Sequence, residues 1–396
     1  MQVITENKLV PQLRFSKFEV NWNSDRLVNL SERVIVGLAT SVTEYYTDEE
    51  IDSVPIIRNQ NIKDGYFDGT KMLYLTKDFS DKHPNKRVKK QDVITVHTGS
   101  NVGLTCVVPD DFDNAQTFTT LIVTTKKNIL CPNFLKDTLS SYKGKNQALK
   151  LVVGGGKGNL NTSDFKIYPL FFPSLTEQQK IASFLSSVDD KLQQLTIKKE
   201  LLEEYKKGIM QQIFSQELRF KDDNGNNYPD WEEKRLGEIS SKDSSNISAN
   251  KIEENFGEYV LYGASGVLKK IDFYREENPY ISIVKDGAGV GRVLMCEPYS
   301  SVLGTLDMIK PKGSNNLYFI YILLQRIYFE RYTVGSTIPH IYFKDYSLEK
   351  IKVPSLEEQK KIAKFLSSLD SKIDLVSTQI ENTKPFKKGL LQQMFV

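Results

Sequence analysis

The sequence predicts a mixed α/β protein in which two globular domains are joined by two long helices, arranged as an internal repeat with pseudo-twofold character. A chain of 396 residues is too long for one core of ordinary size. Short strand-like segments alternate with turn residues and helical segments in both halves of the chain. A long helical segment in the middle of the chain returns at its end. We expect globular domains at 1–172 and 217–353, and helices at 173–216 and 354–396.

The composition excludes several classes of protein. No apolar stretch reaches the roughly 20 residues that cross a membrane, and the first residues lack the apolar core of a signal peptide, so a cytoplasmic location is expected. The three cysteines and three histidines are scattered without metal-ligand spacing, and no metal site is expected. The net charge of +3 is only mildly basic, so a nucleic-acid partner has to be argued from local clusters.

The duplication is clearest in the two helical segments. Residues 172–214 align without a gap on 353–395, and 21 of the 43 positions are identical. Weaker matches lie upstream of both segments, where the spacing between the copies is larger. They are Leu13-Arg14-Phe15 with Leu218-Arg219-Phe220, Trp22 with Trp231, and Val96-x-x-Gly99-x-x-Val102-Gly103 with Val284-x-x-Gly287-x-x-Val290-Gly291. Each copy is therefore a divergent domain followed by a closely preserved helix.

Both helices are predicted to begin in the same way and to pack on each other. Ser174 and Ser355 follow a proline and precede a glutamate by three residues, which is the pattern of a capping box. The apolar residues then follow a 4,3 spacing that is typical of a coiled-coil seam. In the first copy they are Ile181, Leu185, Val188, Leu192, Leu195, Leu202, Ile209 and Ile213, and in the second Ile362, Leu366, Leu369, Ile373, Val376, Ile380, Leu390 and Met394.

Two features interrupt this seam. Lys206 and Lys387 occupy positions of core type. Pro385 lies inside the second helix and predicts a kink near its end. The length of the helices is a separate observation. A helix from about Thr176 to Phe214 spans roughly 58 Å at 1.5 Å per residue. This length exceeds one turn of DNA, which is roughly 34 Å.

The polar face of the helices is more alike between the copies than a solvated face requires. We interpret it as a duplicated surface for a partner protein, and common ancestry without function is the alternative. The candidate partner-binding residues are Gln178, Lys180, Ser187, Gln359, Lys361 and Ser368.

Basic and amide-rich loops in the divergent domains are candidates for contact with DNA. Arginine can read guanine and an amide can read adenine through paired hydrogen bonds, and basic side chains neutralise phosphates. Capped turns and solvated loops are the alternative interpretation. The candidates are Arg58, Asn59, Gln60, Asn61, Lys86, Arg87, His97, Thr98, Ser100, Asn101 and Lys157 in the first domain, and Lys285, Arg292, Ser336, Thr337 and His340 in the second.

The sequence does not predict catalysis by this chain. Gly287-Ala-Gly289-Val-Gly291 and Gly154 to Gly158 resemble phosphate-binding glycine loops, but the spacing or the surrounding βαβ unit is missing. An adenine-methyltransferase motif of the type (Asp/Asn)-Pro-Pro-(Tyr/Phe) is also absent from the sequence. We therefore expect catalytic residues and cofactors in partner subunits.

The duplicated order of domain and helix resembles the specificity subunits of type I restriction-modification systems over nearly the whole chain. The resemblance is carried by Pro173-Ser-Leu with Glu177-Gln178 and Lys180-Ile-Ala182, by the equivalent residues from Pro354 to Ala363, and by Gly335-Ser-Thr-Ile-Pro-His340. It implies two target-recognition domains that each read half of an interrupted DNA site, with the helices as an antiparallel spacer. It further implies two methyltransferase subunits, two motor-nuclease subunits, and S-adenosylmethionine, ATP and Mg²⁺ bound by those partners.

Two other classes of function compete with this interpretation. An autonomous DNA methyltransferase or nuclease would bind its cofactor without partners. A coiled-coil scaffold would have no role at DNA, and retention of specific DNA by the assembled complex would exclude it.

Overall fold

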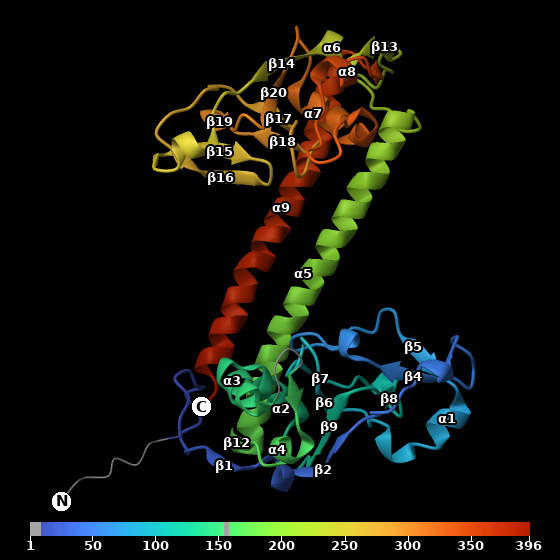
Figure 1. Cartoon of the computed structure of the whole chain (residues 1–396), viewed down its shortest axis with the longest axis vertical. Coiled ribbons are helices and arrows are strands. Elements are labelled where there is room, and N and C mark those ends of the chain that lie inside the picture. Colours follow the sequence, from blue (N-terminus) through green and yellow to red (C-terminus); the bar gives the residue numbers. More distant parts are fainter. Residues whose placement is uncertain (1–8, 154–157) are drawn as a thin grey trace, which may run out of the picture. The chain divides into compact units, whose positions relative to one another are not determined.

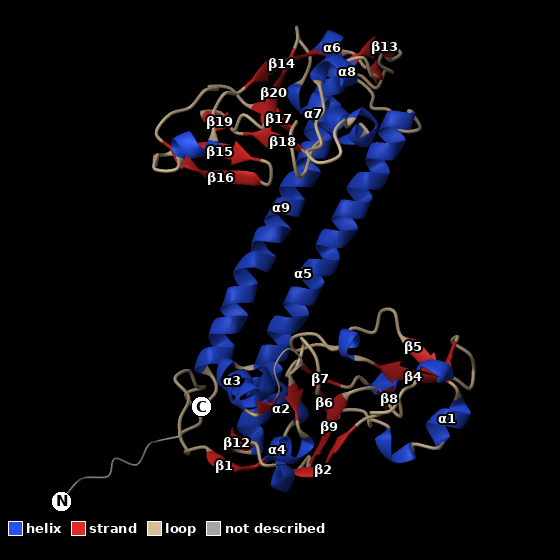
Figure 2. Ribbon diagram, in the orientation of Figure 1, coloured by secondary structure: helices blue, strands red, loops and turns tan. Residues whose placement is uncertain are grey.

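The computed structural model describes residues 9–153 and 158–396, which form two compact units. Unit 1 comprises the chain up to Lys198 together with Ser377–Val396, and unit 2 comprises Lys199–Val376. Each unit contains both helices and strands (Figure 2), as the mixed pattern of the sequence predicts. Both long helices are shared between the units, because each begins in one unit and ends in the other.

Unit 1 contains two four-stranded sheets, a two-stranded ribbon, and a short pair of strands, β10 (Val152–Val153) and β11 (Asn159–Leu160). The larger antiparallel sheet has the order β2 (Ser31–Val36), β9 (Thr120–Thr125), β6 (Val93–Val96) and β7 (Thr105–Val107). The second sheet has the order β3 (Tyr46–Thr47), β5 (Leu73–Leu75), β4 (Val54–Ile57) and β8 (Gln116–Thr117). β1 (Asn23–Arg26) and β12 (Pro169–Phe172) form the ribbon that leads into the first long helix.

Unit 2 repeats this plan. Its four-stranded sheet has the order β14 (Ser240–Ser244), β20 (Leu306–Pro311), β17 (Tyr280–Val284) and β18 (Val293–Cys296). A three-stranded sheet joins β16 (Gly266–Ile271), β15 (Tyr259–Gly263) and β19 (Ser300–Val302). β13 (Glu232–Arg235) pairs with β21 (Lys350–Val353) as the counterpart of the ribbon in unit 1.

The central strands explain where the cores lie. β9 and β17 are buried along their whole length, as their β-branched sequences TLIVTT and YISIV predict for strands covered on both faces. Short helices cover these sheets: α2 (Pro132–Ser140), α3 (Tyr142–Lys150) and α4 (Thr162–Lys166) in unit 1, and α7 (Leu317–Arg326) and α8 (Phe343–Tyr346) in unit 2. The remaining helices, α1 (Lys77–Asp81) and α6 (Leu236–Ile239), are single turns.

The apolar run from Leu317 to Tyr328 is not helical to its end. α7 ends at Arg326, Ile327 is extended, and a separate 3-10 turn, η7, follows at Phe329–Tyr332. The apolar sequence continues because Phe329 enters the same core from the turn.

The long helices are α5 (Leu175–Ser215) and α9 (Leu356–Gln393), and their first residues differ by the repeat spacing of 181. Every predicted seam residue is buried or half-buried, which confirms the apolar pattern. In each unit the end of one helix packs beside the start of the other, so the two run antiparallel there (Figure 1). α9 continues through the exposed Pro385 to Gln393, so the proline does not end the helix.

The predicted capping boxes are only half formed. The amide of Glu177 donates to Ser174 Oγ and that of Glu358 to Ser355 Oγ, both at 3.4 Å. The glutamate side chains do not return to the cap, because each is engaged by an arginine and a tryptophan from the N-terminal part of its copy. We call these two groups the glutamate clasps: Arg14, Trp22 and Glu177 in unit 1, and Arg219, Trp231 and Glu358 in unit 2.

Among the helices of the described residues, none is long and apolar enough to cross a membrane.

Candidate nucleic-acid interface

A glycine hairpin loop connects two strands of the main sheet in each unit. In unit 1 the loop joins β6 to β7, and Gly99 and Gly103 have φ angles of 102° and 88°. Such angles are strained for residues with a side chain, so the loop needs glycine at both positions. The amide of Val102 donates to Gly99 O at 3.2 Å, and that of Gly103 donates to Val96 O at 3.0 Å.

The loop between β17 and β18 in unit 2 has the same backbone. Gly287 and Gly291 have φ angles of 80° and 82°. The amide of Val290 donates to Gly287 O at 3.2 Å, and that of Gly291 donates to Val284 O at 2.8 Å. The repeated V-x-x-G-x-x-V-G pattern therefore specifies one loop conformation twice.

A second segment is bonded to each glycine hairpin loop by equivalent backbone bonds. In unit 1 Leu160 donates to His97 O at 3.0 Å and Gly99 donates to Gly158 O at 3.2 Å. In unit 2 Ile341 donates to Lys285 O at 3.0 Å and Gly287 donates to Pro339 O at 2.9 Å. Candidate residues that are more than 50 positions apart in the sequence are thereby brought together.

The unit 1 loop presents mainly amide, hydroxyl and imidazole groups. His97 and Thr98 are half-buried, while Ser100, Asn101 and the neighbouring Gln60 are exposed. Asn59 supports the loop by donating from Nδ2 to Thr98 O at 3.0 Å. Burial lowers the pKa of His97, which favours its neutral form.

The unit 2 loop presents charged groups on the same backbone. Lys285 Nζ lies 3.1 Å from the buried Asp307 Oδ1, and His340 Nδ1 contacts Asp286 Oδ1. Arg292 is exposed and donates from Nη1 to Ala264 O at 2.7 Å. Ser336 and Thr337 are exposed at the tip of a tight turn that is closed by paired backbone bonds between Val334 and His340.

Several predicted residues are used inside unit 1 instead. Asn61 is 1% exposed and donates to Asp68 O and Thr70 O, so the prediction that it reads DNA is wrong. Lys86 donates to Val36 O, and Arg87 binds Ser80 Oγ and Asp81 Oδ1. Arg58 is half-buried and donates to Lys71 O at 3.3 Å. Lys157 lies outside the described residues.

The predicted partner surface divides into two groups. Gln178 and Gln359 are fully buried and bond the backbone of their own unit: the Oε1 atoms accept from Cys131 N and Asn316 N, each at 2.9 Å. The prediction that these glutamines contact a partner is therefore wrong. Lys180, Ser187 and Ser368 are exposed, whereas Lys361 donates to Lys221 O and pairs with Asp223.

The acidic residues that fix the unit 2 loop were missed from the sequence. Asp286 and Asp307 contact His340 and Lys285, respectively. An isolated aspartate has no sequence pattern that marks it as a loop-supporting residue. Asp286 does directly follow Lys285, which is a predicted DNA-binding residue. The glutamate clasps had a visible signal, because arginine and tryptophan recur ahead of both helices.

Within the described residues, no group of three or more histidines, cysteines, aspartates and glutamates is arranged to hold a metal ion. The buried cysteine thiols lie in apolar cores, where burial raises the pKa of Cys106 to about 12 and that of Cys296 to about 11.

Comparison with known proteins gives consistent results. The chain is 32% identical over 202 residues to the type I restriction enzyme MjaVIII specificity subunit of Methanocaldococcus jannaschii, a match that spans 47% of this chain and 47% of that protein. A second relative from the same archaeon, MjaX, is 26% identical over 417 residues, covering 95% of this chain and 94% of its own.

The fold resembles that of the S subunit of a type I restriction-modification system from M. genitalium, with a TM-score of 0.71 and 20% identity over 98% of this chain and 99% of that one. The family model described as type I restriction modification DNA specificity domain matches residues 37–203 and 228–383. Since these two matches cover well over half of the chain, the protein belongs to the type I restriction-modification DNA specificity family.

Proposed function

We propose that this specificity subunit reads a DNA site in two parts, one part with each unit, and positions partner subunits that carry out the chemistry. The observation that supports this proposal best is the pair of glycine hairpin loops. Their backbone bonds are equivalent, yet the side chains at matching positions differ: His97 and Thr98 in unit 1 correspond to Lys285 and Asp286 in unit 2. One backbone that presents two sets of side chains suits two different half-sites.

The two loops offer different chemistry to a base edge. Gln60 and Asn101 in unit 1 carry exposed amides, which suit adenine. In unit 2, Lys285 and Arg292 suit guanine or a phosphate, and Ser336 and Thr337 can bond to either kind of edge.

The partner surface is proposed on the exposed polar positions of α5 and α9, which include Lys180, Ser187 and Ser368. Two methyltransferase subunits would dock there, and two motor-nuclease subunits would join them for restriction. In this proposal the chain is non-catalytic, and S-adenosylmethionine, ATP and Mg²⁺ are bound by the partners. Methyl transfer or DNA cleavage by the purified chain alone would contradict it.

Loop exchange with methylation mapping tests two-part reading. Residues 285–292 are replaced by the eight residues at 97–104, and methylated motifs are mapped across the genome of cells that express the partners. We expect one half of the methylated motif to change and the other half to remain. A change in both halves, or no change in an active variant, would contradict the proposal. Replacing the exposed turn residue Ser265 with alanine is the matched control.

A further inference from the structure

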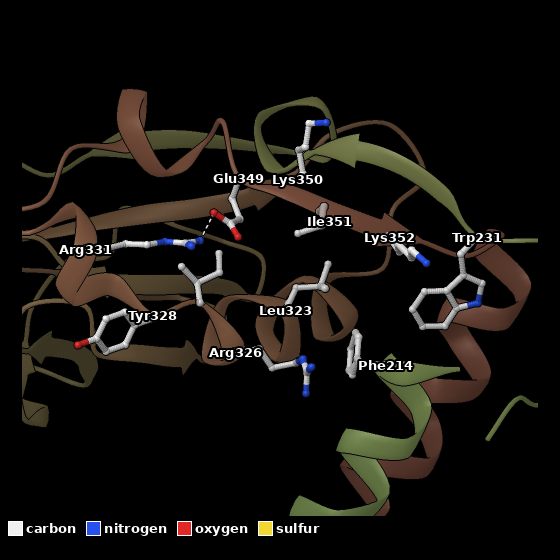
Figure 3. A pocket seen from close by; sticks show the side chains of 11 residues that line it. Phe214, Trp231, Leu323, Arg326, Tyr328, Arg331, Glu349, Lys350, Ile351 and Lys352 are labelled. Carbon is white, nitrogen blue, oxygen red and sulfur yellow. Dashed lines mark hydrogen bonds and ion pairs between the residues drawn. The ribbon is translucent and has the colours of Figure 1, made fainter. Parts of the chain in front are cut away.

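Unit 2 contains a pocket of about 330 Å³ where the β13–β21 ribbon meets the ends of α5 and α7 (Figure 3). Its apolar lining includes Phe214, Trp231, Leu323 and Ile351. Figure 3 shows Trp231 at one end of the pocket and Tyr328 with Arg331 at the other. This is a different part of unit 2 from the glycine hairpin loop, none of whose residues line the pocket.

The polar lining of the pocket is predominantly basic. It comprises Arg326, Arg331, Lys350 and Lys352 with one carboxylate, that of Glu349. Glu349 is already bound by Arg331, and Lys350 pairs with Glu233 at 2.9 Å.

Arg326, like the exposed Lys352, is a cation of the pocket without an ion pair among the described residues. The centre of its guanidinium lies 4.4 Å from the centroid of the Phe214 ring. In the part of the chain that the structure describes, no carboxylate forms an ion pair with it, and its partial burial lowers the pKa of Arg326. A carboxylate that entered the pocket could form a bidentate pair with this guanidinium.

The equivalent place in unit 1 is filled by the protein itself. Lys143 of α3 donates from Nζ to Phe395 O at 3.2 Å, and Phe395 is the counterpart of Phe214. Tyr168, the counterpart of Glu349, donates to Gly144 O at 3.2 Å. Gln147 donates to the carbonyl of Pro169, the counterpart of Lys350, at 2.9 Å. The first turns of α3 therefore cover, in unit 1, the place that corresponds to the open pocket of unit 2.

A short deletion explains the difference. Phe134 contacts Trp22 in unit 1, and Phe319 contacts the equivalent Trp231 in unit 2. The two phenylalanines are therefore equivalent, and they lie 185 positions apart in the sequence. Phe165 and Tyr346, further along, are buried equivalents with a spacing of 181. Unit 2 thus lacks four residues between these points, about one helical turn. Ile327 and Tyr328 connect α7 directly to the 3-10 turn η7. The pocket, which both residues line, therefore stays open.

We propose that the pocket of unit 2 is a docking site for an acidic helical segment of a partner protein. One turn of that segment takes the place that the first turn of α3 has in unit 1, its apolar side chains pack on Phe214, Leu323 and Ile351, and a carboxylate pairs with Arg326. A protein segment suits the site better than a DNA phosphate, because apolar side chains share the lining with the basic ones and because a protein helix occupies the counterpart.

Fluorescence anisotropy with two labelled peptides tests the proposal on the full-length chain. The first peptide copies residues 141–152, and the second copies them with Lys143→Glu, Lys145→Glu and Lys150→Glu. We expect the acidic peptide to bind at least about tenfold more tightly than the basic one, which corresponds to about 1.4 kcal/mol. Arg326→Glu in the chain should reverse this preference, and Arg326→Gln, which keeps a polar side chain of similar size, should remove it.

The controls distinguish a protein segment from DNA as the ligand of the pocket. Lys251→Glu changes the charge of an exposed residue outside the pocket and should leave the affinity of both peptides unchanged. Equal affinities of the two peptides for the unaltered chain, or an acidic peptide that is insensitive to Arg326→Glu, would overturn the proposal. Displacement of the acidic peptide by a short DNA duplex would also overturn it and assign the pocket to the DNA surface.

A second measurement uses the assembled restriction-modification complex. Arg326→Glu should weaken binding of a protein subunit at least about tenfold and leave the affinity for specific DNA unchanged. The opposite pattern would contradict protein docking. The peptide measurement does not depend on the proposed reading of DNA, so failure of one proposal is distinguishable from failure of the other.

Discussion

Lys206 of α5 forms an ion pair with Asp370 of α9 in unit 2. Adding or subtracting the repeat spacing of 181 gives the equivalent pair in unit 1, Lys387 with Asp189, at 2.5 Å. Each lysine that interrupts the apolar seam therefore forms an ion pair with an aspartate of the other helix. Each helix contributes one lysine and one aspartate. Asp370 also accepts from the hydroxyl of Tyr318, and Asp189 from Lys136. Half-buried polar pairs of this kind can fix the register of a helix pair.

We expect Lys206→Ala to destabilise unit 2, because the side chains of Lys206 and Asp370 are only 14% and 29% exposed. The free energy of unfolding should fall by about 1–2 kcal/mol. Each kcal/mol lost should lower Tm by about 2–4 °C. Differential scanning calorimetry measures it, with the exposed Lys207→Ala as control. Exchanging the charges, with Lys206→Asp and Asp370→Lys together, should recover part of the loss. No recovery would mean that the pair does not act as a unit.

The glutamate clasps should stabilise the two units independently. Glu358 is fully buried, and its carboxylate accepts from Arg219 Nη2 at 2.8 Å and from Trp231 Nε1 at 3.1 Å. Glu358→Gln removes the charge opposite Arg219 and should cost about 2–3 kcal/mol. Limited proteolysis should then cleave unit 2 faster and leave unit 1 unchanged, and Glu177→Gln should do the reverse. The neighbouring exposed Glu357→Gln serves as control.

The glycine hairpin loops should differ in their tolerance of alanine. At Gly103, with φ of 88°, an added Cβ meets nothing within 4 Å, so Gly103→Ala should cost only the backbone strain of about 1–2 kcal/mol. At Gly291, with φ of 82°, the Cβ would lie 2.6 Å from that of Phe329, a core residue. Gly291→Ala should therefore cost at least about 1 kcal/mol more, as measured by the loss in Tm of each unit. Equal losses would contradict the close approach of Phe329.

The stability of unit 1 should depend on the protonation of His97. Its pKa is lowered by burial, so the unfolded chain binds the proton more readily than the folded chain does. The stabilisation is complete above the unfolded pKa of about 6.5 and is lost as the pH falls toward the lower folded pKa, by at most about 1.4 kcal/mol per pH unit. Urea unfolding between pH 7.5 and 5 measures it. The difference between the unaltered chain and His97→Gln isolates the histidine, and a difference that is constant with pH would contradict the prediction.

Arg292 is exposed beside the glycine hairpin loop, where we propose that it contacts a phosphate. Arg292→Ala should weaken binding of the assembled complex to all DNA sequences and reduce the slope of log affinity against log salt by about one. Affinity titrations at several salt concentrations measure the slope. Lys251→Ala, which removes one positive charge from an exposed residue outside the loop and the pocket, is the matched control and should leave the slope unchanged. Loss of affinity at only one target base would show that Arg292 reads a base.

The sequence by itself determined the features that repeat or follow a local period. The duplicated segments place the starts of α5 and α9 at Leu175 and Leu356, and the repeated glycines specify the two hairpin loops, because periodic burial and positive φ angles leave direct marks on residue choice.

Only the tertiary structure decided which polar side chains face inward. Asn61, Gln178 and Gln359 look like exposed polar residues in the sequence, but each is buried by bonds to backbone groups. The partners of Lys206 and Arg14 lie more than 160 residues away, so no local pattern identifies them. The pocket of unit 2 likewise results from the loss of one helical turn against a core that is otherwise repeated. These contacts depend on how distant segments pack, which local periodicity does not encode.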